Sequence, residues 1–317
     1  MNDRDADAVA LQLCPFSAQL EEGLSQLFEV VRWHALSAAE QMKFLDQRAG
    51  EVVAVVTGGH IGCPARLMAA LPNLGIISIN GVGFDKVDLD DAKARGIRVT
   101  TTPDVLTADV ADLAVGLTID LLRGIGTSDR FLRAGKWQTG ERPLGVRVTG
   151  KRFGIVGLGR IGRAAADRLA VFGPVRYYGP RPKEAPFPYE AKLVDLADWA
   201  DVLVVACSAN AASRHLVDAP VLAALGGDGF LVNVSRGLVV DEQALIEALE
   251  DRVIRGAALD VFADEPRVPD ALVQSERTVL TPHIASATEE CRREMAEMVL
   301  GNLRAFLSAQ PLLTAVA

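Results

Sequence analysis

The chain has 317 residues, of which 50% are hydrophobic and 5% aromatic, and its formal net charge is −8. That length fits two domains of ordinary size, each with an aliphatic core. Acidic and basic residues are intermingled, which argues against nucleic acid or an anionic membrane as a partner.

The chain shows no targeting, membrane or metal signal. Its first residues are acidic and lack the basic and apolar regions of a secretory signal. No apolar run reaches the roughly twenty residues that span a bilayer. Cys14, Cys63, Cys207 and Cys291 lie far apart without metal-ligand spacing, so we expect no metal site and a reduced, cytoplasmic protein.

Short β-like runs alternate with helices through the first hundred residues. We expect strands at Val9–Leu13, Phe28–Val31, Val52–Val56, Ile76–Ile79 and Ile97–Thr100. We expect helices between them at 37–48, 64–70 and 89–95. This alternation predicts an α/β fold with a parallel sheet that helices cover on both faces.

A long helix at Asp104–Leu122, started by Pro103, is expected to connect this unit to a second one. The second unit is predicted to have strands at 153–156, 175–178, 202–206, 230–234, 257–259 and 279–280. A final helix, 288–307, is left over after this second sheet is complete. We therefore predict a flavodoxin-like substrate domain at 1–102 and 284–317, and a doubly wound Rossmann-type dinucleotide-binding domain at 103–283.

The strand Phe153–Val156 runs into the turn Gly157-Leu158-Gly159-Arg160-Ile161-Gly162, and a helix-like stretch follows at Arg163–Val171. Such a turn presents free backbone N–H groups and a positive helix end to a pyrophosphate, and its glycines permit close approach. Glycine turns also occur for packing alone. Together with the alternating strands and helices, the turn predicts a bound dinucleotide.

The loop after the next strand indicates which dinucleotide is bound. A site that prefers NAD places Asp or Glu there, about twenty residues on, to bind the ribose 2′-hydroxyl. This chain has Gly179-Pro180-Arg181-Pro182-Lys183, and its first carboxylate is Glu184. Arg181 would bind a 2′-phosphate through its forked donors, and Lys183 would add positive potential. We predict NADPH rather than NADH; a solvated basic turn is the alternative.

Three later segments, 233–237, 260–266 and 281–286, each follow a predicted strand and carry one polar side chain suited to chemistry. These side chains are Arg236, Glu265 and His283. The carboxyl ends of parallel strands converge on the ligand crevice of an open α/β sheet. Each residue taken singly also fits an ordinary surface or loop position.

Together the three side chains provide what the reduction of a 2-keto acid requires. Arg236 would bind the substrate carboxylate with a bidentate contact. His283 would protonate the carbonyl oxygen as hydride arrives from the nicotinamide. Glu265 would accept a hydrogen bond from the second ring nitrogen and stabilise the charged imidazole. Small 2-keto acids are therefore the expected substrates.

Six segments, in this order along the chain, resemble the D-isomer-specific 2-hydroxyacid dehydrogenase family, most of all its NADPH-dependent glyoxylate/hydroxypyruvate reductases. The resemblance covers roughly residues 50 to 308. The segments are Asn80–Asp85, Thr102–Thr107, Gly157–Gly162, Val234–Gly237, Asp260–Phe262 and Pro282–Ile284. The resemblance implies the same roles for Arg236, Glu265 and His283.

The resemblance also implies contacts that the residues alone do not predict. The backbone at Val82 and Gly83 would hold the substrate carboxylate from the first domain. The implied cofactor contacts are Thr107, Arg160, Ile161, Cys207, Ser208, Val234, Arg236, Asp260, His283 and Ala285, with Asp260 and the Val234 backbone at the carboxamide. Family members are usually homodimers. Trp137 matches a tryptophan that reaches the active site of the partner subunit in similar reductases. The alternative role of Trp137 is packing within the dimer arm.

One segment departs from the family. Where relatives commonly have a Pro-Leu-Thr-type loop, this chain has Ser208-Ala209-Asn210-Ala211-Ala212-Ser213, so the family pattern does not specify the detailed cofactor contacts of that loop. Two other functions remain open at this stage. One is an NAD-linked phosphoglycerate-type dehydrogenase, which a missing basic cluster at 57–62 disfavours. The other is a nucleotide sensor without turnover, which would need no proton-transfer residues.

Overall fold

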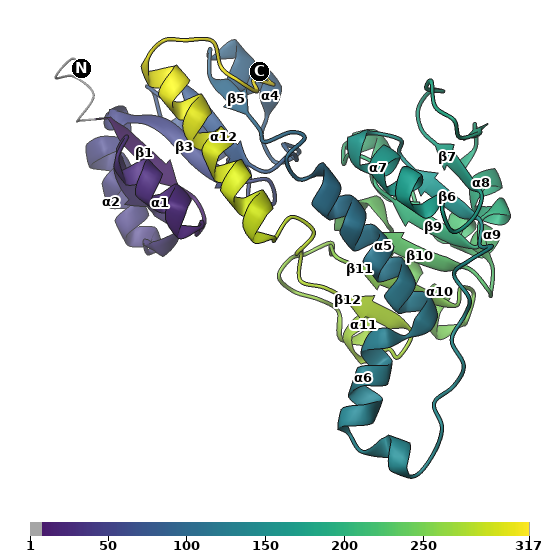
Figure 1. Ribbon diagram of the computed structural model, residues 1–317. Helices are drawn as coiled ribbons and strands as arrows, with labels where there is room; N and C mark the ends of the chain where they lie inside the picture. Colours follow the sequence, from purple (N-terminus) through teal and green to yellow (C-terminus); the bar gives the residue numbers. More distant parts are fainter. Residues whose placement is uncertain (1–7, 317) are drawn as a thin grey trace. The chain divides into compact units, whose positions relative to one another are not determined.

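The computed structural model describes residues 8–316, which divide into two units. One unit comprises residues 8–106 and 288–316, and the other comprises residues 107–287. The sequence had placed the boundaries after 102 and 283. Each unit is built around its own parallel sheet (Figure 1).

The first unit has a five-stranded parallel sheet in the order β2-β1-β3-β4-β5, the flavodoxin-like order. Its strands are β1 (Val9–Gln12), β2 (Glu29–Arg32), β3 (Val52–Gly58), β4 (Ile76–Asn80) and β5 (Arg98–Thr100). Val, Ile and Leu dominate the three central strands because helices bury both faces of the sheet.

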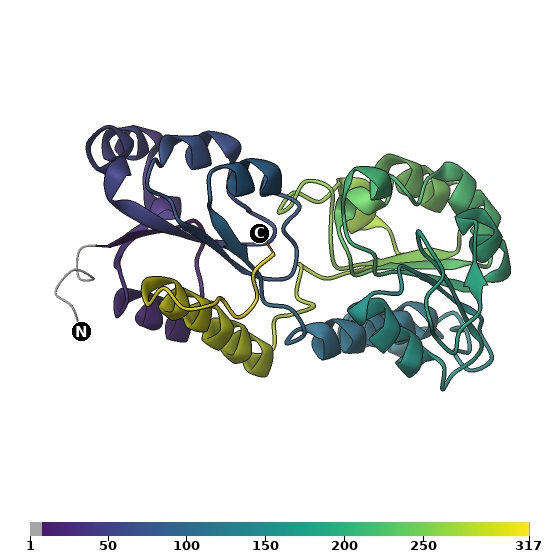
Figure 2. The ribbon, with the colours of Figure 1, turned by 90° about the horizontal axis from the view of Figure 1, so that it is seen from above.

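Helices cover both faces of this sheet (Figure 2). One face carries α1 (Ala18–Ser25) and α12 (Glu289–Leu307). The other face carries α2 (Ala38–Arg48), α3 (Ala65–Ala70) and α4 (Leu89–Ala94). Two short 3₁₀ turns, η1 (Trp33–Ala35) and η2 (Ala49–Glu51), lie before and after α2. Ala10 of β1 packs with Val299 and Leu303 of α12, while its neighbours Val9 and Leu11 point to the opposite face. The C-terminal helix therefore packs on the first sheet, as its position after the second sheet predicted.

The C-terminal tail covers the edge strand β5. Asn302 of α12 is fully buried; its side-chain oxygen accepts the N–H of Thr314 at 3.2 Å, and its amide donates to the Thr314 hydroxyl at 2.8 Å. That hydroxyl donates to the Thr101 carbonyl at 2.6 Å, and the N–H of Val316 donates to Val99. The tail thus bonds to backbone groups that an open sheet edge would expose.

The second unit has a seven-stranded sheet in the order β12-β11-β10-β9-β6-β7-β8. Its strands are β6 (Phe153–Val156), β7 (Val175–Tyr178), β8 (Tyr189–Glu190), β9 (Val202–Val205), β10 (Phe230–Asn233), β11 (Gly256–Leu259) and β12 (Thr278–Leu280). The order reverses between β6 and β9, which is the topological switch point of a Rossmann fold. The sequence prediction had missed β8, which has only two residues.

Helices also cover both faces of the second sheet (Figures 1 and 2). One face carries α5 (Thr107–Arg123) and α7 (Arg160–Leu169). The other face carries α8 (Leu193–Trp199), α9 (Ala219–Leu225) and α10 (Glu242–Glu250), and α11 (Asp270–Gln274) lies beside β12. The 3₁₀ turns η4 (Ala211–Ser213) and η5 (Gly237–Val239) lie in loops. After α5, the helix α6 (Ile125–Arg133) and the 3₁₀ turn η3 (Lys136–Gln138) extend away from this sheet.

Two predicted helix starts are wrong. Asp104 has φ 72°, a left-handed conformation that a helix does not accommodate, so α5 begins only at Thr107. By contrast, α7 begins at Arg160, inside the glycine motif, rather than at Arg163. No helix within residues 8–316 is long and apolar enough to cross a membrane.

Candidate active site

The glycine turn joins β6 to α7 through close backbone packing. Gly157 has φ 94°, a conformation that favours glycine. A Cβ on Gly162 would lie 1.9 Å from the Gly157 carbonyl oxygen, so this position also requires glycine. Because Gly157 adopts this conformation and Gly162 has no Cβ, α7 can begin within the glycine turn, close to the end of β6.

The N-terminus of α7 fits a pyrophosphate group. Gly159 is its N-cap residue, no side chain caps the helix there, and a Cβ at Gly159 would have nothing within 4 Å. The first-turn N–H groups of a helix carry partial positive charge and attract phosphate oxygens. Arg160 is exposed and Ile161 half-buried at this end of α7. These residues are those expected to hold a dinucleotide.

The loop after β7 carries basic residues next to the glycine turn. Arg181 and Lys183 are both exposed, and the Lys183 ammonium donates to the Leu158 carbonyl at 2.8 Å. This bond joins the basic loop directly to the glycine turn. The loop has no carboxylate before Glu184, so its charge suits an anionic group on the adenosine rather than a neutral ribose hydroxyl.

Cys207, Ser208 and Val234 follow the neighbouring strands. A Cβ on Gly157 would lie 2.5 Å from the Cys207 Cα, so the chain after β9 packs directly on the glycine turn. Burial raises the pKa of the Cys207 thiol to about 11, which keeps it protonated and unreactive near neutral pH. The Ser208 carbonyl accepts from the Ser213 hydroxyl at 2.9 Å, and Val234 is buried beyond β10.

Arg236 lies on a tight turn at the end of β10. The turn is organised by buried Asn233, whose side-chain oxygen accepts the N–H and hydroxyl of Ser235 at 3.0 and 2.9 Å. The Asn233 amide donates to the Arg236 carbonyl at 3.1 Å. The Arg236 guanidinium donates to the Ser235 carbonyl at 2.8 Å, so both the backbone and the side chain of Arg236 are held in place.

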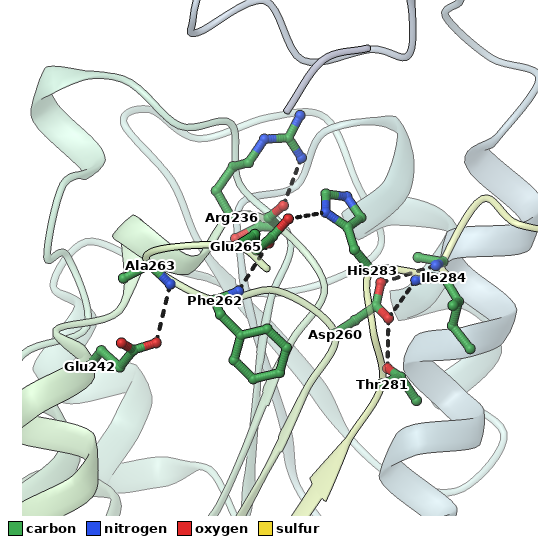
Figure 3. Close-up of polar contacts among 11 residues, drawn as sticks. Arg236, Glu242, Asp260, Phe262, Ala263, Glu265, Thr281, His283 and Ile284 are labelled. Carbon is green, nitrogen blue, oxygen red and sulfur yellow. Dashed lines mark hydrogen bonds and ion pairs between the residues drawn. The ribbon is translucent and has the colours of Figure 1, made fainter. Parts of the chain in front are cut away.

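His283 and Glu265 form a hydrogen-bonded pair (Figure 3). Nδ1 of His283 lies 2.7 Å from Oε2 of Glu265, and the two side chains are 31% and 20% exposed. The other oxygen of Glu265 accepts the N–H of Phe262 at 3.0 Å. Because Glu265 is fixed to its own loop, it orients the imidazole through Nδ1.

The turn that carries His283 is held by a buried carboxylate. Asp260 is 1% exposed; its Oδ1 accepts from the Thr281 hydroxyl at 2.6 Å and the Ile284 N–H at 2.8 Å, and its Oδ2 accepts the Ala285 N–H at 3.0 Å. Burial raises the pKa of Asp260, and the three hydrogen bonds act in the opposite direction. His283 itself has φ 53°, a left-handed conformation that is uncommon for a non-glycine residue and that these hydrogen bonds help to hold.

The segments that carry Arg236 and Glu265 are in direct backbone contact. A Cβ on Gly237 would lie 1.9 Å from the backbone carbon of Phe262, so glycine is required next to Arg236. Glu242 of α10 adds a second anchor, accepting the N–H of Ala263 at 3.1 Å. Arg236, Glu265 and His283 therefore gather at the carboxyl ends of β10, β11 and β12 (Figure 3).

The remaining predicted site residues come from other segments of the chain. Val82 and Gly83 follow β4 in the first unit and are half-buried. Thr107 is the first residue of α5. Trp137 lies on η3 with 71% of its surface exposed. Within residues 8–316, no group of three His, Cys, Asp or Glu side chains is arranged to hold a metal.

Comparisons with known proteins identify the family. The family model described as "D-isomer specific 2-hydroxyacid dehydrogenase, NAD binding domain" matches residues 115–285. A glyoxylate/hydroxypyruvate reductase A of Arabidopsis thaliana is 47% identical over 308 residues, which cover 96% of this chain and 98% of the relative. The chain belongs to the D-isomer-specific 2-hydroxyacid dehydrogenase family.

Two further family members bear on the site. A hydroxyphenylpyruvate reductase of Plectranthus scutellarioides is 44% identical over 308 residues, covering 96% of this chain and 98% of the relative. The crystal structure of an NADPH-dependent glyoxylate/hydroxypyruvate reductase of Sinorhizobium meliloti, in complex with NADP and malonate, matches with a TM-score of 0.90 and 40% identity. That match covers 98% of this chain and 97% of the other.

Sequence reasoning assigned no role to three residues that build this dehydrogenase site. Asn233 organises the Arg236 turn, Gly237 admits the Phe262 backbone, and Glu242 anchors Ala263. The place of Asp260 at the nicotinamide carboxamide stays a prediction. In the structure its oxygens accept hydrogen bonds from the His283 turn. The one sequence signal was Asn233 at the end of an apolar strand, a position where a polar side chain often bonds to the following turn.

We expect Gly237→Ala to lower both stability and activity, although it alters none of the Arg236, Glu265 and His283 side chains. The new methyl group would overlap the Phe262 backbone, which cannot rotate away as a side chain can. The variant should lose about 1 to 3 kcal/mol of unfolding free energy in urea. Displacement of Arg236 should lower kcat/KM by about tenfold to a hundredfold.

Gly116→Ala is the matched control, because Gly116 lies exposed within α5 and a Cβ there would have nothing within 4 Å. This control should be neutral or stabilising by about 0.5 to 1 kcal/mol, since alanine favours a helix. Unchanged stability and kcat/KM in Gly237→Ala would contradict the role given to this contact.

Proposed function

We propose that the chain reduces small 2-keto acids, with glyoxylate and hydroxypyruvate favoured, to 2-hydroxy acids with NADPH. The observation that carries the proposal is the His283–Glu265 pair, bonded at 2.7 Å beside the Arg236 turn and in the same unit as the glycine turn. The printed names of the Arabidopsis relative and of the Sinorhizobium structure support this substrate class and this cofactor.

Arg236 binds the substrate in this proposal. Its guanidinium offers a planar fork of donors that matches a carboxylate, and the bonds from Asn233 and to Ser235 fix the position of that fork. A fixed cation holds the carboxylate, and therefore the adjacent keto carbon, in one place. The backbone N–H groups at Val82 and Gly83 are proposed to bind the same carboxylate.

His283 moves the proton. When bound, NADPH supplies the hydride that reduces the keto carbon. Glu265 accepts from Nδ1 of His283, so a protonated imidazole directs its Nε2–H toward the carbonyl oxygen. As charge develops on that oxygen, Nε2 donates the proton and the imidazole becomes neutral. Glu265 offsets the positive charge that His283 carries before the transfer.

The cofactor would lie along the switch point of the second sheet. We assign the pyrophosphate to the glycine turn with Arg160 and Ile161, and an adenosine 2′-phosphate to Arg181 and Lys183. The remaining proposed contacts are Cys207 and Ser208 on the adenosine side, and Thr107, Val234, Asp260 and Ala285 on the nicotinamide side. The open N-terminus of α7 supports the first assignment, and the basic loop supports the second.

The division of labour between the units follows. We propose that residues 107–287 bind the dinucleotide and that the first unit contributes to the substrate site. We also propose a cytoplasmic homodimer. The thiols of Cys14, Cys63 and Cys207, which form no disulfide, suit a reducing compartment. The exposed Trp137 on η3 supports a partner at α6 and η3.

Two other functions stay as alternatives. An NAD-linked phosphoglycerate-type dehydrogenase would need a carboxylate at the end of β7, and Arg181 and Lys183 stand there instead. A nucleotide sensor without turnover would have no use for the pair between His283 and Glu265.

A panel of 2-keto acids, extended by 3-phosphoglycerate with NAD in the oxidative direction, separates these functions. With NADPH we expect measurable oxidation by glyoxylate and hydroxypyruvate, and lower kcat/KM with NADH. A bulkier aryl keto acid belongs in the panel because one 44% identical relative is a hydroxyphenylpyruvate reductase. Turnover of 3-phosphoglycerate with NAD as the best reaction would favour the phosphoglycerate alternative, and absence of any turnover would favour a sensor.

We expect His283→Ala to lower kcat by at least about a hundredfold while NADPH binding stays within about twofold. The reason is that the imidazole acts on the substrate oxygen rather than on the cofactor. Fluorescence titration of NADPH and steady-state kinetics measure the two effects. His34→Ala, an exposed histidine in the first unit, is the control and should keep full activity. Comparable losses of affinity and rate in His283→Ala would contradict the role of proton donor.

We expect Arg181→Ala to weaken the binding of NADPH and to leave the binding of NADH nearly unchanged. Loss of a charge-assisted bond to a 2′-phosphate should raise KM for NADPH by about tenfold to a hundredfold. KM for NADH should change by less than about twofold, because NADH has no 2′-phosphate. Arg32→Ala removes an exposed arginine from the first unit and serves as the control. Equal losses for both cofactors would overturn the assignment of Arg181.

A further inference from the structure

A buried tyrosine hydroxyl holds the basic loop after β7. The hydroxyl of Tyr177 accepts the backbone N–H of Lys183 at 2.7 Å and donates to the backbone carbonyl of the same residue at 3.1 Å. Tyr177 is only 1% exposed. One hydroxyl therefore satisfies both backbone groups of a residue six positions further along the chain.

The two bonds act on a segment that has little regular structure of its own. Residues 179–188 include Pro180, Pro182, Pro186 and Pro188, which lack backbone N–H groups. A loop with few backbone hydrogen bonds relies on side chains for its order, because each residue that is fixed loses conformational entropy. Tyr177 supplies that order from the β7 side.

Two further contacts hold the same loop. The Tyr189 hydroxyl donates to the Gly179 carbonyl at 3.0 Å, and the rings of Tyr177 and Tyr189 lie 5.4 Å apart. The Lys183 ammonium donates to the Leu158 carbonyl of the glycine turn at 2.8 Å. The backbone of Lys183 is thus fixed by Tyr177, and its side chain reaches the turn that binds the pyrophosphate in the proposed function.

We propose that Tyr177 is a positioning residue for the 2′-phosphate of the cofactor. Its hydroxyl sets the course of the loop from Gly179 to Lys183, and so places Arg181 and Lys183 beside the adenosine before any nucleotide binds. A site arranged in advance does not lose binding energy to ordering the loop. This inference rests on the proposed NADPH preference and names the residue that builds it.

The test is calorimetric binding of two adenosine nucleotides to the full-length protein. One probe is 2′,5′-ADP, which carries the 2′-phosphate, and the other is 5′-AMP, which lacks it. Tyr177→Phe removes only the hydroxyl and keeps the buried ring. We expect the Kd for 2′,5′-ADP to rise by about five- to tenfold, and the Kd for 5′-AMP to change by less than about twofold.

Tyr178→Phe is the matched control, because it makes the same substitution on the neighbouring residue of β7, which packs on the opposite face with the Leu193 and Leu196 cluster. It should change neither Kd by more than about twofold. Tyr189→Phe removes the hydrogen bond to the Gly179 carbonyl. It should also raise the Kd for 2′,5′-ADP selectively, but to a smaller extent. This variant keeps the inference testable if Tyr177→Phe does not fold.

The outcomes separate the inference from the function on which it rests. If the unaltered protein binds 5′-AMP as tightly as 2′,5′-ADP, the NADPH proposal fails and the inference fails with it. If the unaltered protein prefers 2′,5′-ADP but Tyr177→Phe leaves both Kd values unchanged, or weakens both equally, only the role of Tyr177 is overturned.

Discussion

The candidate active site depends on a backbone contact between two loops. Gly237, next to Arg236, has no Cβ, and the backbone of Phe262 occupies the space where one would lie. This contact brings the end of β10 against the loop that follows β11, where Glu265 is fixed by the Phe262 N–H. The distance between the segment that carries Arg236 and the segment that carries Glu265 is therefore set by main-chain packing, which deforms far less than side chains do.

Asp260 performs a comparable task for His283. Its buried carboxylate has three donors from the turn that follows β12, and two of them are backbone N–H groups. Burial alone would favour the protonated form, while the three donors favour the carboxylate. Hydrogen bonds to a buried charged acceptor are strong and short, so the left-handed conformation of His283 is held against its strain.

Much of the fold could be predicted from the sequence because buried parallel strands appear as apolar runs. Val52–Val56 and Val202–Ala206 are such runs, and the structure has β3 and β9 there. The position of the C-terminal helix after a complete second sheet also predicted that this helix packs against the first sheet. The two-residue strand β8 has no detectable pattern, and the start of α5 depends on the conformation of Asp104 rather than on the position of Pro103.

Of the candidate site, the sequence predicted the proximity of His283 and Glu265 because both follow strands that end at one edge of a sheet. It could not predict the supporting residues. The bonds from Asn233, Asp260 and Glu242 join side chains to the backbone of loops, and they have neither a period nor a fixed spacing in sequence. Which loop a buried polar side chain reaches is decided by the folded path of the chain.

The same arrangement occurs at two places in the second unit, after β11 and on β7. Asp260 holds the loop of His283, and Tyr177 holds the loop of Arg181; in each case a nearly fully buried polar side chain bonds to loop backbone. A buried polar group without partners would destabilise the fold, so the loop must adopt the one path that satisfies it. Burial of the anchor thus restricts the path of an exposed loop, and with it the position of the side chain that the loop carries.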